Sequence, residues 1–573
     1  MRTMKIERPI RKFLPNDLII EDWTDIESFF NDLLERELNS VSDLEQWLSD
    51  QSELEAILEE DMAWRYIRMT IDTTNEEHAN RYKTFVTDIQ PKISPIEDKL
   101  NKKLVSCPFA KELSSDDYSI LFKRINRSIE LFREENIPLQ SKLSEESQKF
   151  GALSATQTIE HDGKVLTMQK AALLLKETDE VLRMEIFKKI AERRREDFIK
   201  FEELFDSLLG LRHQIAVNAG FKNYRDYKLA AMCRFDYDVR DCEAFHASIK
   251  DLIVPIVKKI QESRLKKFGK DKFRPWDLDV DPEGGAPLKP FGSGDELLTG
   301  TISMFNQIDP YFGDCLTKMD EMNHLDLESK AGKSPGGYNY PLYEIGVPFI
   351  FMNAVGSQRD LVTMVHEGGH AIHSFLSRDL KLTGFKNLPS EVAELASMSM
   401  ELLSMEEWDT FYTNENELKR AKTEQLESLI KILPWIAQVD EFQHWLYVHH
   451  AHTADERKQK WKELSNEYGT GLVDWKGFED IRDTSWQRQL HIFEVPFYYI
   501  EYGIAQLGAI GVWKNSLENK EKAIHDYKEA LKLAYTKSIP EIYAMANVEF
   551  KFSYPHIAQL ADFVDNQLKI LHT

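Results

Sequence analysis

The sequence predicts a mainly α-helical protein of several regions that contains one small β element. Along most of the chain the apolar residues recur every three or four positions, which is typical of amphipathic helices. Residues that favour strands concentrate in one segment, PFIFMNAV at 348–355. The chain has 573 residues, more than one small core can organise, so we expect at least two domains.

The helical pattern begins near the N-terminus and is interrupted at two places. Residues 22–70 are rich in Leu, Glu and Asp, and their apolar positions have helical spacing. At 151–169 the sequence around HDG alternates between apolar and polar residues, which predicts a small β-hairpin. The segment 274–294 is dense in Pro, Gly and Asp, so we expect it to be irregular. Beyond residue 357 the pattern is again mostly helical.

The charge balance excludes some classes of partner. The chain carries 97 acidic and 73 basic residues, a formal net charge of −24. Nucleic acids and anionic membrane surfaces bind basic faces, so neither is expected as the main partner. No stretch approaches the ~20 consecutive apolar residues of a membrane helix, and the first residues lack the apolar run of a signal peptide.

The cysteines are scattered and show no CxxC spacing. They are Cys107, Cys233, Cys242 and Cys315. Such isolated cysteines are typical of buried or unused thiols in a reducing compartment. Together with the character of the first residues, they lead us to expect a cytoplasmic location.

The stretch TMVHEGGHAIHSFL carries histidines four residues apart on a predicted helix. Ser357 has the chemistry of an N-cap, and Asp360 falls in the first turn, where a negative charge is favourable. His366 and His370 lie about 40° apart around such a helix and about 5.4 Å apart along it. Two imidazoles in this arrangement can bind one zinc ion. Glu367 follows the first histidine and can reach a water on that ion as a general base.

A structural helix that happens to carry histidines is the alternative. Gly368 and Gly369 argue against it, because a glycine in a helix interior costs about 1 kcal/mol relative to alanine. The close approach of another backbone, or of a substrate, would explain them. His373 lies on the same face as His366 but about 10.5 Å along the axis, too far to share the ion. We expect it to be a pocket-lining or core residue.

A catalytic zinc site of this kind needs a third protein ligand and an open fourth position. The next predicted helix, SEVAELASMSMELL, begins after Pro389 and contains Glu391 and Glu394 one turn apart. Spacing alone leaves both open as the third ligand. Glu401 lies two turns beyond Glu394, and it either orients a ligand or is a solvated helix glutamate.

The motif HEGGHAIH followed by VAELAS resembles the oligoendopeptidase F branch of the thimet-oligopeptidase-like zinc peptidases. Similar stretches include AGFKNYRDYKL at 219–229 and RPWDLDV at 274–280, and the resemblance covers about residues 110–565. The first hundred residues match only in helical style. The resemblance places the third ligand at Glu394 and implies one Zn²⁺ per chain.

The resemblance also implies a fold and a class of substrate. The fold is a large, mainly α metallopeptidase of two lobes around a deep central channel, with a small β element next to the zinc helix. The substrates are short, unstructured oligopeptides. The regions expected along the chain are a helical N-terminal region over 1–110, a helical region with the hairpin that completes the N-terminal lobe over 111–200, and a catalytic zinc-peptidase domain over 201–573.

A second candidate segment, QRQLHIFEVPFYYIEYGIAQLGA, lies far downstream. Peptide hydrolysis passes through a tetrahedral oxyanion, which a neutral phenol or imidazole can stabilise by donating a hydrogen bond. The family carries a histidine followed by a tyrosine-rich helix here, and the resemblance maps these catalytic roles to His491, Tyr498 and Tyr502. Tyr499 is expected to be turned away from their face and is assigned to substrate binding. A helix whose aromatic residues only pack is the alternative.

The glycine-rich stretch SPGGYNYPLYE precedes the strand segment. An extended peptide can pair with a glycine-rich sheet edge through backbone hydrogen bonds. We therefore assign Gly336, Gly337 and Tyr338 to substrate binding, and Tyr340 can also line a subsite. A plain surface loop is the alternative.

These observations favour a zinc-dependent endopeptidase of oligopeptides in which Glu367 activates a zinc-bound water. A non-catalytic peptide-binding protein with a structural zinc is a second hypothesis, although such a site needs no base and is usually closed by four protein ligands. A third is a carboxypeptidase, for which Arg488 is the candidate anchor of a terminal carboxylate. The expected partners are peptides, and the sequence does not choose between a monomer and a homo-oligomer.

Overall fold

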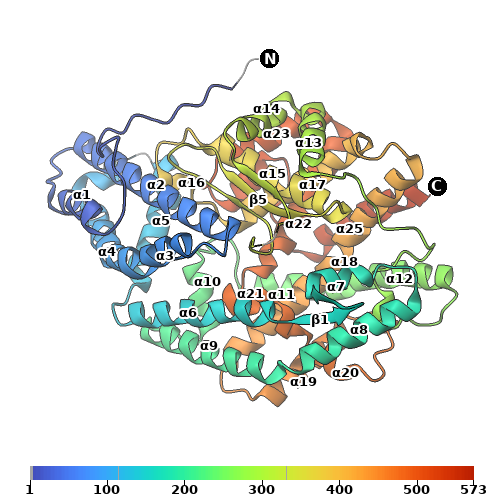
Figure 1. Cartoon of the computed structure of the whole chain (residues 1–573). Coiled ribbons are helices and arrows are strands. Elements are labelled where there is room, and N and C mark those ends of the chain that lie inside the picture. The colour runs from blue at the N-terminus through green and yellow to red at the C-terminus, as the bar shows by residue number, and fades with distance from the viewer. Residues whose placement is uncertain (1–3, 114, 331, 573) are drawn as a thin grey trace. The chain divides into compact units, whose positions relative to one another are not determined.

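Figure 1 shows the computed structural model of the chain, which describes residues 4–113, 115–330 and 332–572. Within these residues the protein is mainly helical, as the sequence predicts, and its strands form small sheets. The chain divides into two compact units, each assembled from three separate segments. The first unit comprises Met1–Phe132, Lys289–Lys419 and Ala505–Phe550, and the second comprises Arg133–Leu288, Arg420–Ile504 and Lys551–Thr573.

These units interleave along the chain. The boundaries expected near residues 110 and 200 divide the chain into consecutive regions, which these units do not. That division stays a prediction. The central channel expected from the resemblance also stays a prediction, and each unit is described separately below.

The first unit is a set of amphipathic helices with one sheet. In chain order its elements are α1 (Thr24–Glu35), α2 (Val41–Ile71), α3 (Glu76–Thr84), α4 (Gln90–Ser106), α5 (Ser115–Leu131), α13 (Gly294–Ile308), α14 (Pro310–Glu321), β3 (Leu325–Glu328), β4 (Tyr338–Tyr340), β5 (Phe349–Ala354), α15 (Gln358–Ser377), α16 (Thr383–Lys386), α17 (Ser390–Ser404), the part of α22 (Tyr499–Glu518) from residue 505, α23 (Lys520–Lys532) and α24 (Ile539–Met545). Phe30 of α1, Trp47 of α2 and Leu100 of α4 belong to one buried core, which Phe385 of α16 joins from far along the chain.

The sheet of the first unit lies beside α15 (Figure 1). Its central strand is β5, which runs parallel to β3 and antiparallel to β4. Every residue of β5 except Asn353 is buried, which explains why this segment is a nearly continuous run of apolar β-formers. The strand predicted at 348–355, just before the histidine helix, is confirmed.

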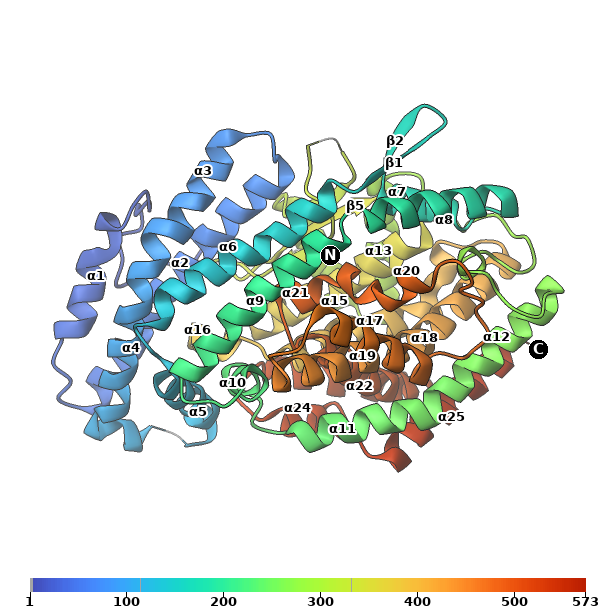
Figure 2. The same ribbon diagram turned by 90° about the horizontal axis from the view of Figure 1, so that it is seen from below.

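The second unit is also helical. Its elements are α6 (Asn136–Ala155), β1 (Thr158–His161), β2 (Lys164–Thr167), α7 (Met168–Leu174), α8 (Glu180–Arg195), α9 (Phe198–Asn218), α10 (Tyr224–Ala231), α11 (Val239–Ser248), α12 (Val254–Phe268), α18 (Glu415–Val448) from residue 420, α19 (Ala454–Glu467), α20 (Glu479–Asp483), α21 (Leu490–Glu494), the first turns of α22 and α25 (Tyr554–His572). Helices α6 and α9 run side by side, as Figure 2 shows.

The hairpin predicted around HDG is confirmed as β1 and β2. Asp162 and Gly163 form its turn with φ values of 50° and 70°, the left-handed geometry that suits a two-residue hairpin. The segment 274–294 is irregular apart from a single 3₁₀ turn and the first residue of α13. Of the helices described, none combines the length and apolar character needed to cross a membrane.

Candidate metal centre

Helix α15 begins where the sequence predicts. The Oγ of Ser357 accepts a hydrogen bond from the backbone N–H of Asp360 at 3.3 Å. The Asp360 carboxylate in turn accepts one from the N–H of Ser357 at 2.9 Å. This reciprocal capping fixes the start of the helix and hence the direction in which its histidines point.

The paired glycines of α15 allow other elements to approach closely. A Cβ added to Gly369 would lie 2.6 Å from Cα of Ser397 and 2.7 Å from the carbonyl oxygen of Ala396, both on α17. A Cβ added to Gly368 would lie 2.8 Å from the ring of Phe305 on α13. Of the explanations that the sequence left open, backbone approach therefore holds for Gly369. Helices α15 and α17 pack side by side at this point (Figure 1).

This contact brings the predicted ligands together. Nε2 of His366 is 3.4 Å and Nε2 of His370 is 3.7 Å from Oε2 of Glu394. One donor atom from each of these residues lies within 4.8 Å of the other two, close enough to share one ion. The histidine side chains are 20% and 19% exposed, so solvent reaches the cluster. In the described part of the chain the cluster contains Glu394 and not Glu391.

Two further residues hold these ligands in place. Nδ1 of His366 donates to Oε1 of Glu401 at 2.7 Å, so Nε2 is left to face the cluster. Of the roles considered for Glu401, this contact favours the orienting one. The Oγ of Ser397 donates to Oε2 of Glu394 at 3.0 Å. Sequence reasoning missed Ser397. The only feature of the sequence that could have indicated it is its position, one helical turn after Glu394.

The donor set fits a metal such as zinc. Burial and the neighbouring carboxylates shift the pKa values of the two imidazoles in opposite directions. Burial lowers the pKa of His366, but Glu394 and Glu401 outweigh burial and hold that pKa well above its ordinary value. At His370 burial prevails and lowers the pKa to about 4, although Glu394 opposes it. A metal ion needs neutral imidazoles, so binding must displace the proton that His366 holds.

Glu367 is buried beside this cluster, with 7% of its surface exposed. Burial raises the pKa of its carboxyl to about 7; His366 opposes that shift and Glu394 adds to it. A carboxyl with such a pKa can both accept and return a proton near neutral pH. Nδ2 of Asn339, on β4, donates to the backbone carbonyl of Glu367 at 3.3 Å and ties the strand to the helix. Sequence reasoning missed Asn339.

His373 is a core residue, one of the roles expected for it. It is 1% exposed, and burial lowers its pKa to about 3. Glu391 is likewise buried, and its backbone carbonyl accepts a hydrogen bond from Tyr543 at 3.0 Å.

The glycine-rich stretch before β5 supplies the outer strand of the sheet. Gly336 has a φ of +101°, a conformation that favours glycine. A Cβ on Gly337 would lie 3.3 Å from the carbonyl oxygen of Phe351. The backbone conformation and the packing therefore explain why glycine occupies these two positions, whether or not a substrate binds there.

Tyr338 and Tyr340 form the two ends of β4. The ring of Tyr338 stacks on Phe351 at 4.8 Å, and its hydroxyl lies 2.6 Å from Oγ1 of Thr70. The hydroxyl of Tyr340 lies 3.3 Å from the sulfur of Met62. Both phenols are thus anchored on α2, and their backbone forms an outer strand of the sheet.

The downstream histidine and tyrosines belong to the second unit, where they form one aromatic cluster. The ring of His491 lies 4.7 Å from Tyr499, 5.7 Å from Tyr502 and 6.0 Å from Tyr498. Helical spacing suggested that Tyr499 is turned away from the others. In the structure its ring lies with theirs. The reason is that Phe497 has a φ of +68° and α22 begins only at Tyr499, so one helical wheel does not describe the segment.

The neighbours of this cluster are polar. Nε2 of Gln489 lies 2.7 Å from Nδ1 of His491. Burial raises the pKa of Tyr499 to about 12. The guanidinium of Arg488 lies 4.8 Å from the ring centre of Trp435, which is a cation–π contact.

Comparisons with known proteins identify the family. The model of peptidase family M3 matches residues 173–561, and that of the peptidase M3 N-terminal domain matches residues 17–132. The second match corrects the sequence analysis, which found only a helical style in the first hundred residues. These residues precede the metal cluster in the chain but belong to the same compact unit.

Individual relatives agree with the family models. An oligoendopeptidase F homologue from Borreliella burgdorferi is 27% identical over 220 residues, which cover 37% of this chain and 36% of the relative. The oligopeptidase PepF of Bacillus subtilis is 25% identical over 240 residues, which cover 41% of this chain and 35% of the relative. The chain thus spans less than half the length of these curated relatives in the alignments.

The solved structure of PZ peptidase A with inhibitor 2 matches along almost the whole chain. It has a TM-score of 0.90 and 26% identity, and the match covers 99% of this chain and 98% of that one. The mainly helical fold that the resemblance implied is confirmed, and so is the metallo-oligopeptidase class at the level of the family. The chain belongs to peptidase family M3.

Proposed function

We propose that this chain is a zinc-dependent endopeptidase that hydrolyses internal bonds of short, unstructured oligopeptides. The observation that carries the proposal is the position of Glu367 beside the cluster of His366, His370 and Glu394. These residues would hold one zinc ion per chain, because two imidazoles and a carboxylate are the donors of a catalytic zinc site. When bound, the zinc supplies Lewis acidity towards a water molecule and the scissile carbonyl.

In this proposal Glu367 moves the proton. It takes a proton from the attacking water and returns it to the amine that leaves, and its pKa near 7 suits both steps. The hydrogen bond from Nδ1 of His366 to Glu401 directs Nε2 at the cluster, where it can bind the ion once its proton is displaced. The hydrogen bond from Ser397 holds the carboxylate of Glu394 in the same way.

The substrate would bind as an extended chain. Strand β4 is an outer strand of its sheet, and a peptide added to it would be held by backbone hydrogen bonds at Gly336, Gly337 and Tyr338. Such pairing reads the backbone more than the side chains, so it suits unfolded peptides of varied sequence. We assign donation to the oxyanion to His491, Tyr498 and Tyr502, and a substrate contact to Tyr499. The relatives named oligoendopeptidase F support this substrate class.

The alternatives have less support. A structural zinc is usually closed by four protein ligands, whereas the cluster offers three donors among the described residues, and Glu401 engages the far nitrogen of His366. A carboxypeptidase needs an anchor for the terminal carboxylate, and the one candidate, Arg488, stacks on Trp435.

The substitution Glu367→Gln tests the proposal. It keeps the shape of the side chain and removes its ability to accept a proton, so kcat/KM should fall by about 10²–10⁴-fold. Zinc content, measured by mass spectrometry, and the unfolding temperature should stay near those of the wild type. Glu391→Gln is the matched control, since it makes the same change at a buried glutamate outside the cluster. Full turnover by zinc-loaded Glu367→Gln would contradict the proposal.

A further inference from the structure

A second cluster of potential metal ligands lies within the second unit. Helix α11 carries Cys242 and His246 four residues apart, and α18 carries Asp440 and His444 with the same spacing. On each helix the two side chains therefore lie on one face, one turn apart.

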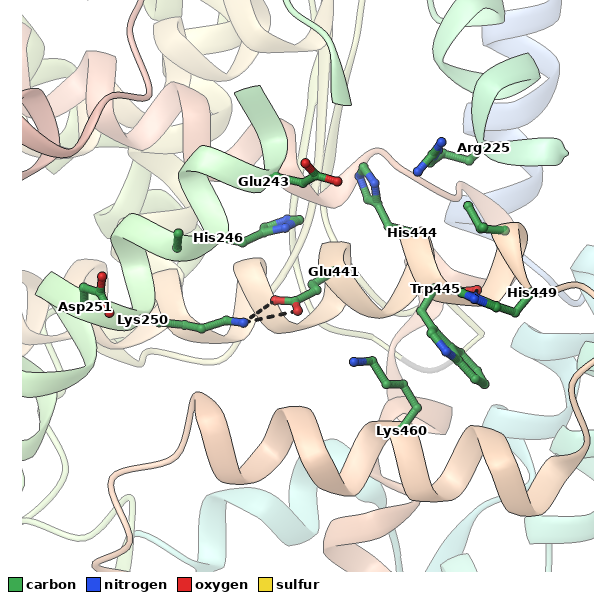
Figure 3. A pocket seen from close by; sticks show the side chains of 12 residues that line it. Arg225, Glu243, His246, Lys250, Asp251, Glu441, His444, Trp445, His449 and Lys460 are labelled. Atoms are coloured by element: carbon green, nitrogen blue, oxygen red, sulfur yellow. Dashed lines mark hydrogen bonds and ion pairs between the residues drawn. The ribbon is translucent and has the colours of Figure 1, made fainter. Parts of the chain in front are cut away.

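The two faces meet. Nε2 of His246 lies 2.8 Å from Oδ2 of Asp440. The rings of His246 and His444 are 5.5 Å apart and nearly perpendicular, and Figure 3 shows them reaching towards each other from the facing helices. One donor atom from each of Cys242, Asp440 and His444 lies within 4.8 Å of the other two.

The cluster is buried, and part of its bonding capacity is unused. Cys242, Asp440 and His444 are 1%, 0% and 8% exposed. Oδ1 of Asp440 and both ring nitrogens of His444 make no hydrogen bond within the described protein. Nε2 of His444 is 3.2 Å from Oδ2 of Asp440, but not in hydrogen-bonding geometry. Buried polar groups are nearly always satisfied, so these atoms call for a partner.

A cavity reaches the histidine side of this cluster. The imidazoles of His246 and His444 line a cavity of about 440 Å³ whose walls include exposed residues such as Glu243 and Asp251 (Figure 3). An ion can therefore reach the histidines without disruption of the core. Lys250 and Glu441, also on the wall, are paired with each other at 2.9 Å.

We propose that Cys242, Asp440 and His444 form a second metal site, which binds a divalent ion of the zinc or cobalt class. A sulfur, a nitrogen and an oxygen donor suit such borderline-soft ions and disfavour Mg²⁺ and Ca²⁺, which take oxygen ligands. His246 is a positioning residue, because its hydrogen bond fixes Oδ2 of Asp440 and leaves Oδ1 directed elsewhere. The bound ion cross-links α11 and α18, which are distant in sequence, and stabilises the second unit.

Cobalt binding tests this site separately from the first cluster. The full chain with His366→Ala and His370→Ala, which lacks the imidazoles of the first cluster, is titrated with Co²⁺ under anaerobic conditions. We expect one equivalent to bind with a thiolate-to-cobalt charge-transfer band in the near ultraviolet. The first cluster contains no cysteine, so it cannot produce this band. Bound cobalt should also raise the unfolding temperature.

Substitutions identify the thiolate and the carboxylate. Cys242→Ser should abolish the band. Cys315→Ser is the matched control, because Cys315 is equally buried but lies on α14 in the first unit, and it should keep the band. Asp440→Asn should keep the band at saturation but weaken cobalt binding at least tenfold, which decides the question even if Cys242→Ser does not fold. A titration of the folded parent chain without this band, or a band that survives Cys242→Ser, would overturn the proposal.

Discussion

The potential metal clusters on α15–α17 and on α11–α18 share the same spacing of ligands along a helix. They differ in the environment of the glutamate beside them. In the sequence, HEGGH, CEAFH and DEFQH each place a glutamate after the first potential ligand and a histidine four positions after that ligand. In the first cluster Glu367 is buried, and its pKa is raised to about 7 by burial. In the second, Glu441 accepts hydrogen bonds from Tyr468 at 2.6 Å and from Lys250 at 3.2 Å. These bonds outweigh burial and lower the pKa of Glu441.

This difference separates metal binding from catalysis. Spacing of four residues on a helix is enough to bring two ligands together. Hydrolysis also needs a carboxylate that can exchange a proton with water near neutral pH. Glu367 has that property, whereas Glu441 is held as an ion by a lysine and a phenol. We therefore expect peptide hydrolysis at the first cluster and metal binding without hydrolysis at the second.

The largest effect should follow removal of the third ligand of the first cluster. Glu394→Gln keeps the size of the side chain but leaves only the imidazoles of His366 and His370 as strong donors. Zinc affinity should fall by more than about 100-fold, beyond the range typical of residues that only orient a ligand, and turnover should be lost with it. Competition with a chelating dye measures the affinity. Wild-type affinity in this variant would contradict the assignment of Glu394 as the third ligand, because the cluster would then have to use another one.

A smaller loss is expected at the residue that orients His366. Glu401→Gln removes the charge that holds Nδ1 of His366 at 2.7 Å, so zinc affinity should fall by about 10–100-fold. Turnover of the zinc-saturated variant should remain within a few-fold of the wild type, which distinguishes it from Glu367→Gln. If neither affinity nor turnover changes, the hydrogen bond from His366 to Glu401 does not contribute to zinc binding.

The contact between α15 and α17 can be tested through its glycines. Gly369→Ala places a Cβ against the backbone of Ser397, which cannot move aside, and should destabilise the fold by about 2 kcal/mol after the helix-propensity gain. Gly368→Ala is the comparison variant, since its Cβ would meet the Phe305 side chain and not a backbone. Denaturant unfolding should rank Gly369→Ala as clearly less stable than Gly368→Ala. Equal stabilities would mean that the backbone contact does not limit the packing.

The pH dependence of zinc binding should reveal the proton on His366. The pKa of His366 is raised in the folded chain, so below that pKa a proton competes with the metal. Apparent affinity should rise by up to about tenfold per pH unit until the pH passes that pKa, and then level off. Calorimetry in buffers of different ionisation enthalpy should show about one proton released per ion near neutral pH. Glu401→Gln should release less, and affinity independent of pH would contradict the assignment.

The first cluster could be predicted from the sequence because every signal for it is local. The cap at Ser357, the spacing of His366 and His370 and the paired glycines all fall within one helix, and Glu394 lies on the next long helix. The choice of Glu394 over Glu391 came from the family resemblance, since spacing left both open. The structure supplies what spacing could not, which is the direction of the Glu394 side chain.

The remaining features depend on contacts between distant segments or on backbone breaks. His246 and Asp440 are 194 positions apart, so no window of sequence shows that their helices face each other. The sequence predicted each cysteine to be a buried or unused thiol. Cys242 is indeed buried. The predicted orientation of Tyr499 was wrong because Phe497 has a positive φ, which is uncommon for a residue other than glycine. Pro496 marks a break before the helix but does not indicate this backbone conformation.

Cleavage of a mixed library of short peptides tests the central claim most directly. The purified chain is assayed as isolated, after chelation and after zinc is added back, and the products are identified by mass spectrometry. The account predicts cuts at internal bonds that disappear with the chelator and return with zinc. Peptides left intact by a fully zinc-loaded sample, or shortened only by single residues from one end, would contradict it.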